Sequence, residues 1–313
     1  MGLPMFLGVD GGGSKTAFAL IDREYSVVAE YETSGSYYLD IGVSSLKDLI
    51  DSGIHAVVSD AGAVIDDIEY AFLGLPAYGE DSRMIAELDA IPDRTLCPGT
   101  YTCDNDMVCA WAGSLDGRDG INLIAGTGSI GFGRFGGRTA RCGGWGELFG
   151  DEGSAFWLAR KGLQLFSRMS DGRAAKGPLL DLVRRELALR QDLDLSTLVL
   201  GDWRSERART AKFAQLMSAA AEQGDVRVID IFRQAAGELY LLAETLRSEL
   251  AVPVGKELPI SVSGGVFNSG RLVSEPFLAA LEASPVDYRF CEPKFTPVIG
   301  AARHAARLSR ERL

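Results

Sequence analysis

The sequence predicts an α/β protein that consists of two similar lobes. Its 313 residues correspond to about two domains at the usual size of roughly 150 residues each. Two stretches, near residues 4–32 and 121–137, share an order of apolar run, glycine turn and second apolar run, which is typical of strands joined by a tight turn. From residue 154 onward the apolar side chains recur mainly at helical spacing.

The first lobe is expected to alternate strands and helices. We expect strands at 4–9, 16–21, 27–32, 70–75 and 100–103, and helices at 43–58 and 82–88. Residues 106–112 are apolar and rich in helix formers, so Asn105 and Asp106 are predicted to lie at a helix N-terminus.

The pattern then restarts. We expect strands at 121–125, 130–135 and 258–263, and helices at 154–168, 178–191, 205–223, 226–250, 271–281 and 297–313. Gly126 of the second glycine turn follows Gly11 of the first by 115 residues, which indicates a duplicated unit. Because no linker or low-complexity segment separates the lobes, they are predicted to meet across a cleft.

Composition excludes several classes of protein. The net charge of −11 repels phosphate backbones, so nucleic acid is not expected as the main partner. No stretch approaches the roughly 18 apolar residues of a membrane helix, and no membrane association is expected. The five cysteines include no CxxC pair and the N-terminus lacks signal-peptide features, so we expect a cytoplasmic protein. A homodimer is expected only because two-fold dimers are common.

Glycine is unusually abundant, with 37 residues against a usual share of roughly 7%. The first glycine-rich turn comprises Gly11, Gly12, Gly13, Ser14, Lys15 and Thr16. It is not the usual nucleotide P-loop, because Ser14 separates the glycines from Lys15 and a strand follows instead of a helix. Its N–H groups and hydroxyl could bind a phosphate, or it could be a simple tight turn. Asp10 precedes it and either caps the turn or holds a hydrated magnesium ion.

Gly126, Thr127, Gly128 and Ser129 form the second candidate phosphate turn. The match of this segment to G-x-G-x-x-G does not indicate a dinucleotide fold, because no helix can start in the glycine-rich sequence that follows. A second phosphate-binding hairpin fits better.

Two further sites carry side chains suited to a polyhydroxylated ligand. Asp106 is either a functional carboxylate or a helix N-cap. Gly144, Trp145 and Asp151 lie in a glycine-rich loop before a predicted helix, where an aromatic face and carboxylates could contact hydroxyl groups. Asp151 could instead cap that helix.

Five motifs occur in a fixed order along the chain. They are DGGGSKT at 10–16, ND at 105–106, AGTGS at 125–129, GGWG with GDEGS at 143–154, and SGGV at 263–266. In this combination, the chain from Met5 to about Ala302 resembles the N-acetylglucosamine kinase family. Relatives of that family include the ATPase activators of 2-hydroxyacyl-CoA dehydratases, and both belong to the sugar kinase/actin/heat-shock-chaperone superfamily.

The resemblance implies an α/β fold of two ribonuclease-H-like lobes, each a mixed sheet flanked by helices, with a nucleotide cleft between the lobes. The N-terminal lobe would comprise residues 1–112 and 297–313, and the C-terminal lobe residues 113–296. The C-terminal helix would pack back on the first lobe.

The resemblance also implies ATP and Mg²⁺ as cofactors and a small-molecule sugar as substrate. The two glycine turns would be the phosphate loops, Asp10 would meet Mg²⁺ through water, and Gly264 and Gly265 would let the adenosine lie against the backbone. Asp106 would be the catalytic base, and Asp151 would hold sugar hydroxyls. Where the family often carries a sugar-binding asparagine, this chain has Tyr37, so the sugar stays open between N-acetylglucosamine, glucosamine and another hexose.

The expected activity is therefore ATP-dependent phosphorylation of a hydroxyl of an amino sugar or hexose. The alternative is an ATPase that activates a partner enzyme, as the dehydratase activators do through a cysteine-held iron–sulfur cluster. Cys97, Cys103, Cys109 and Cys142 could supply thiolates, but the loop with Trp145 and Asp151 favours the kinase. A sugar-sensing regulator is not expected, because such regulators usually carry an N-terminal DNA-binding domain and the first turn already begins at Gly11. An actin-like scaffold is the other non-enzymatic possibility.

Overall fold

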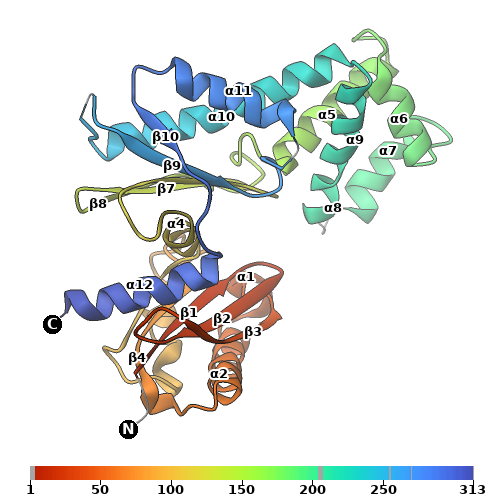
Figure 1. Cartoon of the computed structure of the whole chain (residues 1–313). Coiled ribbons are helices and arrows are strands. Elements are labelled where there is room, and N and C mark those ends of the chain that lie inside the picture. The colour runs from red at the N-terminus through yellow and green to blue at the C-terminus, as the bar shows by residue number, and fades with distance from the viewer. Residues whose placement is uncertain (1–3, 204–206, 254, 269, 313) are drawn as a thin grey trace. The chain divides into compact units, whose positions relative to one another are not determined.

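The computed structural model describes residues 4–203, 207–253, 255–268 and 270–312 (Figure 1). The chain divides into two compact units. Unit 1 extends to Asn122 and resumes at Cys291, whereas unit 2 is continuous from Leu123 to Phe290.

Unit 1 contains a mixed sheet of five strands in the order β3-β2-β1-β4-β5. The strands are β1 (Met5–Gly11), β2 (Lys15–Ile21), β3 (Val27–Ser34), β4 (Ile68–Leu75) and β5 (Tyr101–Asn105). Strands β1, β2 and β3 pair antiparallel, whereas β4 pairs parallel with both β1 and β5. The five strands expected in this part of the chain are therefore present. The carboxyl ends of β1, β4 and β5 point to one edge, where ligand-binding groups gather in open α/β sheets.

The helices of unit 1 cover both faces of this sheet. They are α1 (Tyr38–Ile41), α2 (Val43–Asp60), α3 (Ile85–Asp89), α4 (Met107–Leu115) and α12 (Pro297–Glu311), with 3-10 turns at Ile65–Asp67 and Pro92–Arg94. Helix α2 buries Leu46, Ile50 and Ile54 in the same core as Leu7 and Phe18. This is the helical spacing that the sequence predicts for 43–58.

Helix α12 brings the C-terminal segment back to β1, and Figure 1 shows it alongside the first sheet. A side chain at Gly8 would place its Cβ 2.2 Å from the amide nitrogen of Ala302, so the helix backbone lies directly on the strand. Asp116, just after α4, forms ion pairs with Arg303 at 2.9 Å and Arg307 at 2.6 Å. Close backbone packing and these ion pairs together fix α12 to unit 1.

Unit 2 repeats the strand order of unit 1. Its five-stranded sheet has the order β10-β9-β6-β7-β8, which places β6, β7 and β8 where unit 1 has β1, β2 and β3. The strands are β6 (Gly120–Ala125), β7 (Ser129–Phe135), β8 (Arg138–Gly143), β9 (Leu258–Ser263) and β10 (Tyr288–Phe290). The repeated order is what a duplicated unit predicts.

Unit 2 differs from unit 1 in its additional helices, and Figure 1 shows α5 to α9 grouped at one end of it. The helices are α5 (Ala155–Ser170), α6 (Pro178–Glu186), α7 (Asp194–Thr197), α8 (Arg207–Ala211), α9 (Phe213–Glu222), α10 (Val226–Glu249) and α11 (Arg271–Ala283), with a π-helical turn at Leu198–Asp202. The helix expected over 178–191 ends earlier, and Ala188 just beyond it has a positive φ of 49°. The helix expected over 205–223 is divided into α8 and α9, with residues 204–206 outside the described chain.

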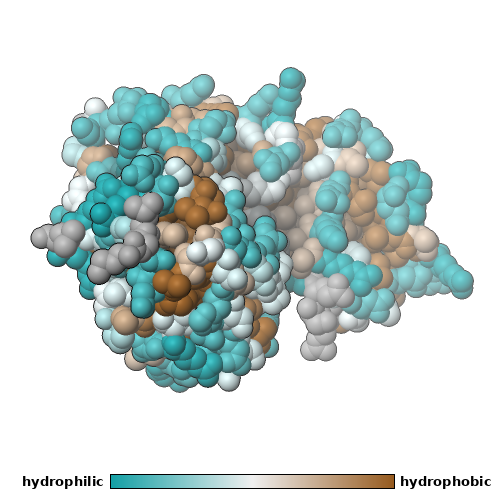
Figure 2. All heavy atoms as spheres, turned by 60° about the horizontal axis from the view of Figure 1, so that its bottom comes forward, coloured by the Kyte–Doolittle hydropathy of each residue, from teal (hydrophilic) through white to brown (hydrophobic). Residues whose placement is uncertain are grey.

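Among the described residues, no helix combines the length and the apolar character needed to cross a bilayer. In the face drawn in Figure 2, hydrophilic residues cover most of the surface and hydrophobic residues form separate patches. Apolar side chains such as Leu7, Phe18 and Phe232 are instead almost fully buried inside the units.

The packing of α12 on β1 makes a prediction about Gly8. We expect Gly8→Ala to lower the free energy of unfolding by about 2 kcal/mol, because its Cβ would overlap the backbone of Ala302. Chemical denaturation measures this loss. Gly237→Ala in α10 is the control, because the space around Gly237 is open and alanine favours helix. Equal stability of the two variants would contradict the close packing.

Candidate functional site

The first glycine turn joins β1 to β2, and its tip at Gly13 and Ser14 is exposed. The segment after β3 supports it from behind. The N–H of Ser36 donates to the carbonyl of Gly12 at 2.9 Å, and a Cβ on Gly35 would lie only 2.2 Å from the Gly13 oxygen. The turn is therefore held in place while its tip faces solvent, as a phosphate-binding turn requires.

The other residues predicted around this turn have mixed environments. The ammonium of Lys15 pairs with Glu32 on β3 at 2.7 Å, on the surface. The side chain of Thr16 is fully buried, so a ligand could meet only its backbone. Gly11 is also buried, with the Ser36 hydroxyl 2.5 Å from where its Cβ would be. Tyr37 is the N-cap residue just before α1, and its partly buried side chain packs against the core.

Two carboxylates meet beside the turn. The pKa of Asp10 is raised to about 7. Burial is the main cause, and the negative charge of Asp106 adds to it, whereas the positive charge of Lys15 lowers the pKa. Gly74 on β4 lies opposite Asp10 in the sheet. A Cβ on Gly74 would lie 3.1 Å from the Cα of Asp106 and 2.3 Å from the Sγ of Cys109. The absence of a side chain at Gly74 thus lets the start of α4 approach the end of β1.

Asp106 is the N-cap residue of α4 by position, but the side chain that bonds to the start of the helix is that of Asn105. The Asn105 Oδ1 accepts from the N–H of Met107 at 3.2 Å, and its Nδ2 donates to the carbonyl of Tyr78 at 3.1 Å. Within the described chain, the Asp106 carboxylate makes no capping hydrogen bond to α4. Asp106 therefore occupies the N-cap position without capping α4 through its side chain, and its carboxylate lies close enough to Asp10 to raise the pKa of that group.

The second glycine turn joins β6 to β7 and rests on the start of α5. The N–H of Gly126 donates to the carbonyl of Gly128 at 2.9 Å and closes the turn. The carbonyls of Gly126 and Thr127 accept from the N–H groups of Ala155 and Phe156, at 2.9 and 3.2 Å. The first turn of α5 therefore fixes the carbonyl side of this turn.

Gly264 packs against the same turn. It has φ +99°, and a Cβ would lie 2.4 Å from the carbonyl oxygen of Ala125, so only glycine fits there. The N–H of Val266 donates to that oxygen at 2.9 Å. Gly264 and Gly265 are therefore brought beside the second turn, and Ser129 connects the turn to the loop before α5 by donating to the carbonyl of Glu152 at 2.7 Å.

Asp151 is buried beside the second turn, with 3% of its side chain exposed. A Cβ on Gly128 would lie 2.7 Å from its Oδ2. The cap of α5 is Ser154, whose hydroxyl oxygen accepts from the N–H of Trp157 at 3.1 Å. The alternative role of Asp151 as the cap of this helix is therefore wrong.

Arg207 is the site residue that the sequence did not reveal. It forms ion pairs with Asp151 and, at 3.3 Å, with Glu147. Burial raises the pKa of Asp151, the charge of Arg207 opposes that rise, and the charge of Glu147 adds to it. Arg207 follows Asp151 by 56 residues and belongs to no motif, so no signal in the sequence pointed to it.

The loop between β8 and α5 exposes apolar side chains. Trp145 is 71% exposed, and Leu148 and Phe149 are 82% and 70% exposed. The N–H of Gly144 donates to the carbonyl of Ser129 at 2.8 Å, which anchors the start of the loop to the second turn. An indole face is thus available to a ligand in unit 2.

The structure therefore brings the predicted residues together in two groups. Unit 1 holds the first turn, Asp10, Asp106 and Tyr37. Unit 2 holds the second turn, Gly144, Trp145, Asp151, Gly264 and Gly265. Among the residues that the structure describes, no group of three or more His, Cys, Asp or Glu side chains could hold a metal ion.

A family model described as the BadF/BadG/BcrA/BcrD ATPase family matches residues 7–305. The chain belongs to this ATPase family. Use of ATP follows from that membership. The resemblance found from the five motifs is confirmed.

Curated relatives of this BadF/BadG/BcrA/BcrD-type protein are sugar kinases. It is 27% identical over 303 residues to the N-acetylmuramic acid/N-acetylglucosamine kinase of Clostridium acetobutylicum, covering 94% of this chain and 96% of that protein. It is 27% identical over 320 residues to the N-acetyl-D-glucosamine kinase of Dictyostelium discoideum, covering 96% and 98%.

A solved structure supports the fold. A Chromobacterium violaceum protein assigned as an N-acetylglucosamine kinase matches with a TM-score of 0.71 at 25% identity, covering 96% of this chain and 98% of that one. The predicted two-lobe α/β fold, with mixed sheets flanked by helices, is confirmed.

The raised pKa of Asp10 makes stability depend on pH in this ATPase-family protein. The folded protein binds the Asp10 proton more tightly than the unfolded chain, so the free energy of unfolding falls as pH rises from about 4 to about 7. The Asp10→Asn variant lacks this titration. In metal-free buffer, its free energy of unfolding relative to that of wild type should therefore rise by about 1–3 kcal/mol from pH 5 to pH 8. Urea unfolding at both pH values measures the gain. A difference that does not change with pH would show that Asp10 titrates normally.

Arg207 is expected to stabilise the buried carboxylate of Asp151. Arg207→Gln should lower the free energy of unfolding by about 1–2 kcal/mol at pH 8, because an unpaired buried carboxylate is unfavourable. The loss should shrink at pH 5, since the pKa of Asp151 rises further without Arg207 and protonation removes the charge.

The matched control for Arg207 is Arg173→Gln, which removes an exposed ion pair to Asp171 in the same unit. We expect the control to lower the free energy of unfolding only slightly. The loss should be nearly the same at pH 5 and pH 8, because the pKa of Asp171 is already low. Identical pH profiles of the two variants in urea unfolding would contradict the role of Arg207.

Proposed function

We propose that this protein uses ATP to phosphorylate a hydroxyl of an amino sugar or related hexose, with N-acetylglucosamine as the first candidate and glucosamine as the second. The observation that carries the proposal is the meeting of Asp10 and Asp106 beside the first glycine turn. The similarity to sugar kinases over nearly the whole chain supports it.

Asp106 is the proposed catalytic base. Its carboxylate would accept the proton of the sugar hydroxyl while that oxygen attacks the γ-phosphorus of ATP. At the start of α4 the Asn105 side chain, and not that of Asp106, accepts the hydrogen bond from the N–H of Met107. Gly74 and Cys109 fix the start of α4 on the sheet and so position this base.

The residues around Asp10 fit a magnesium ion that binds together with ATP. Asp10 is buried beside a second carboxylate and its pKa is raised to about 7, so its negative charge lacks compensation that a cation would supply. Mg²⁺ usually binds through one or two carboxylates, waters and substrate phosphates, which agrees with the absence of a larger ligand cluster among the described residues. When bound, Mg²⁺ would neutralise charge on the phosphate oxygens.

The glycine turns are the proposed phosphate contacts. In unit 1 these are Gly11 to Thr16, chiefly through the backbone N–H groups of the exposed tip. In unit 2 they are Gly126 to Ser129, with the Gly264 and Gly265 backbone proposed to meet the adenosine. Backbone donors that are fixed before the ligand binds stabilise developing charge without reorganising.

The sugar contacts are proposed at Trp145, Gly144 and Asp151 in unit 2 and at Tyr37 in unit 1. The indole of Trp145 is exposed and offers an apolar face to a sugar ring. Asp151 is paired with Arg207, but a carboxylate has lone pairs enough to accept hydroxyl donors as well. Arg207 would thus hold Asp151 ionised and oriented for the sugar.

The alternative of a dehydratase-type activator is less consistent with the cysteines. An iron–sulfur cluster requires thiolates. Cys103 and Cys109 are buried inside unit 1, where burial raises the pKa of both thiols, so neither is presented to a cluster at the surface. Cys97 is exposed and Cys142 half-buried. A cytoplasmic location and a homodimer belong to the same proposal and rest on composition and on the frequency of two-fold dimers.

The proposed function is tested by incubating purified protein with Mg-ATP and a panel of hexoses and amino sugars. We expect ADP release that depends on the sugar, and a phosphorylated sugar by mass spectrometry. ATP hydrolysis that no sugar accelerates, without any phosphorylated product, would overturn the kinase proposal. A coloured anaerobic preparation with an iron–sulfur absorption band would favour the activator.

Replacing the proposed base should separate binding from chemistry. Asp106→Asn should bind ATP like wild type but transfer phosphate about 10²–10⁴-fold more slowly, which is the usual contribution of general-base catalysis. Calorimetry and a coupled ADP assay measure the two quantities. Asp48→Asn is the control because Asp48 is an exposed partner of Arg94. Unchanged turnover in Asp106→Asn would remove Asp106 from the role of base.

A further inference from the structure

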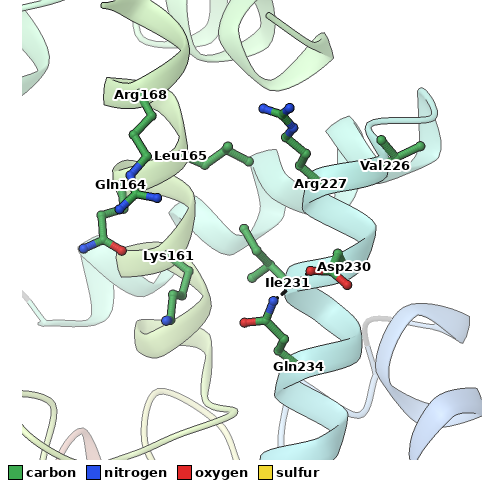
Figure 3. Close-up of a pocket in the computed structure, with 9 residues that line it drawn as sticks. All are labelled: Lys161, Gln164, Leu165, Arg168, Val226, Arg227, Asp230, Ile231 and Gln234. Carbon is green, nitrogen blue, oxygen red and sulfur yellow. Dashed lines mark hydrogen bonds between the residues drawn. The ribbon is translucent and has the colours of Figure 1, made fainter. Parts of the chain in front are cut away.

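A groove of about 420 Å³ lies between α5 and α10 in unit 2 (Figure 3). Its residues lie at 161, 164, 165 and 168 on α5 and at 226, 227, 230, 231 and 234 on α10. This spacing is one face of each helix. None of these residues belongs to the two glycine turns or to the loop before α5, and none is Gly264 or Gly265.

The floor of the groove is apolar. In Figure 3, Leu165 and Ile231 point toward each other from the two helices, and both are about 9% exposed. They are held by the packing that joins α5 and α10 within unit 2. A small ring or alkyl group could therefore lie on this floor.

The rim of the groove is cationic. Lys161 and Arg168 extend from α5 and Arg227 from α10, against the single carboxylate of Asp230. That carboxylate accepts a hydrogen bond from the Gln234 amide at 2.8 Å. The net charge of the groove is therefore +2, in a chain whose overall charge is −11.

The two guanidinium groups at this rim differ from those nearby. Arg173 pairs with Asp171 at 2.7 Å and Arg184 with Asp192 at 2.7 Å. Within the described residues, the guanidiniums of Arg168 and Arg227 form neither an ion pair nor a hydrogen bond, although the charge of Arg168 helps to lower the pKa of Asp171. Their donors are therefore available to a ligand.

The other two polar features near the groove have definite partners. The Lys161 ammonium lies 5.0 Å from the ring centroid of Trp157, which holds it at its end of the groove. The N-terminus of α10 is capped by Asp225, whose carboxylate accepts from the N–H groups of Arg227 and Val228. Anion binding is therefore a matter of the three cationic side chains and not of the helix end.

We propose that the α5–α10 groove binds a phosphomonoester with a compact body, at a site separate from the residues proposed for phosphate transfer. A phosphomonoester carries a charge of about −1.5 to −2 at neutral pH, which matches the net charge of the groove. An arginine guanidinium can donate two parallel hydrogen bonds to phosphate oxygens. Here Arg168 lies on α5 and Arg227 on the facing helix α10. Leu165 and Ile231 would contact the body of the ligand.

The size of the groove restricts its ligand. A volume of about 420 Å³ lies within the usual range for small-molecule pockets, roughly 300–1,000 Å³. A nucleic acid needs an extended basic surface, which the strongly acidic chain does not favour. Phosphorylated sugars and free inorganic phosphate share the phosphate chemistry, and the experiment must separate them.

Calorimetric titration of the full chain tests the proposal with three probes: glucosamine 6-phosphate, inorganic phosphate and unphosphorylated glucosamine. The variant is the double substitution Arg168→Gln and Arg227→Gln, and both side chains are exposed, so the core is untouched. Arg138→Gln is the matched control, an exposed arginine of the same unit that does not line the groove. Circular dichroism confirms that each variant is folded.

We expect the double variant to bind glucosamine 6-phosphate at least tenfold more weakly than wild type and the control, with no change for glucosamine. Wild-type binding should also weaken as salt is raised from about 50 to about 500 mM, because the contacts are ionic. Tighter binding of glucosamine 6-phosphate than of inorganic phosphate identifies the ester as the ligand. Equal affinity of the two probes, or an unchanged affinity in the double variant, would overturn the proposal. If the protein phosphorylates glucosamine, glucosamine 6-phosphate also binds the proposed active site as a product, so only the part of its binding that the double variant removes is assigned to the groove.

Discussion

The close approach of α4 to the sheet at Gly74 is the constraint on which unit 1 depends. No side chain could stand there without meeting Cys109 and the backbone of Asp106. The result is a pair of carboxylates, Asp10 and Asp106, in one partly dry environment at the carboxyl edge of parallel strands. Burial is the main cause of the raised pKa of Asp10, and the like charge of Asp106 adds to it.

The two units show how one topology serves two surroundings. Both sheets have the same strand order, and both place a glycine turn after the first strand. In unit 1 the turn is braced by Gly35 and Ser36, and its neighbours are acidic. In unit 2 the start of α5 and Gly264 brace the turn, and the nearby acid is paired with Arg207. The proposed division of labour, with chemistry in unit 1 and sugar contacts mainly in unit 2, follows that difference.

Much of the fold could be predicted from the sequence, because buried strands are unbroken apolar runs that end at glycine or polar residues. The strand expected over 258–263 is β9 itself. By contrast, β10 has only three residues, which is too short for a periodic signal. Helix α6 ends near Ala188, which has a positive φ. Because alanine rarely adopts this conformation, its presence in the sequence does not predict the end of the helix.

The site was less predictable than the fold, for a physical reason. Motifs such as residues 10–16 and 126–129 identify turns, but whether the side chain of Asp106 or of Asn105 bonds to the start of α4 depends on side-chain geometry. The pairing of Arg207 with Asp151 depends on how α8 packs in unit 2, and nothing local to either residue encodes it.

The return of α12 to β1 also has a consequence for how the chain is made. Unit 1 is assembled from both ends of the sequence, whereas unit 2 is a continuous segment between them. During synthesis, β1 emerges from the ribosome before the whole of unit 2, whereas the helix that covers Gly8 emerges after it. Unit 2 can therefore complete its core while unit 1 waits with one face of its sheet uncovered. That nascent surface needs protection from aggregation until α12 has been synthesised.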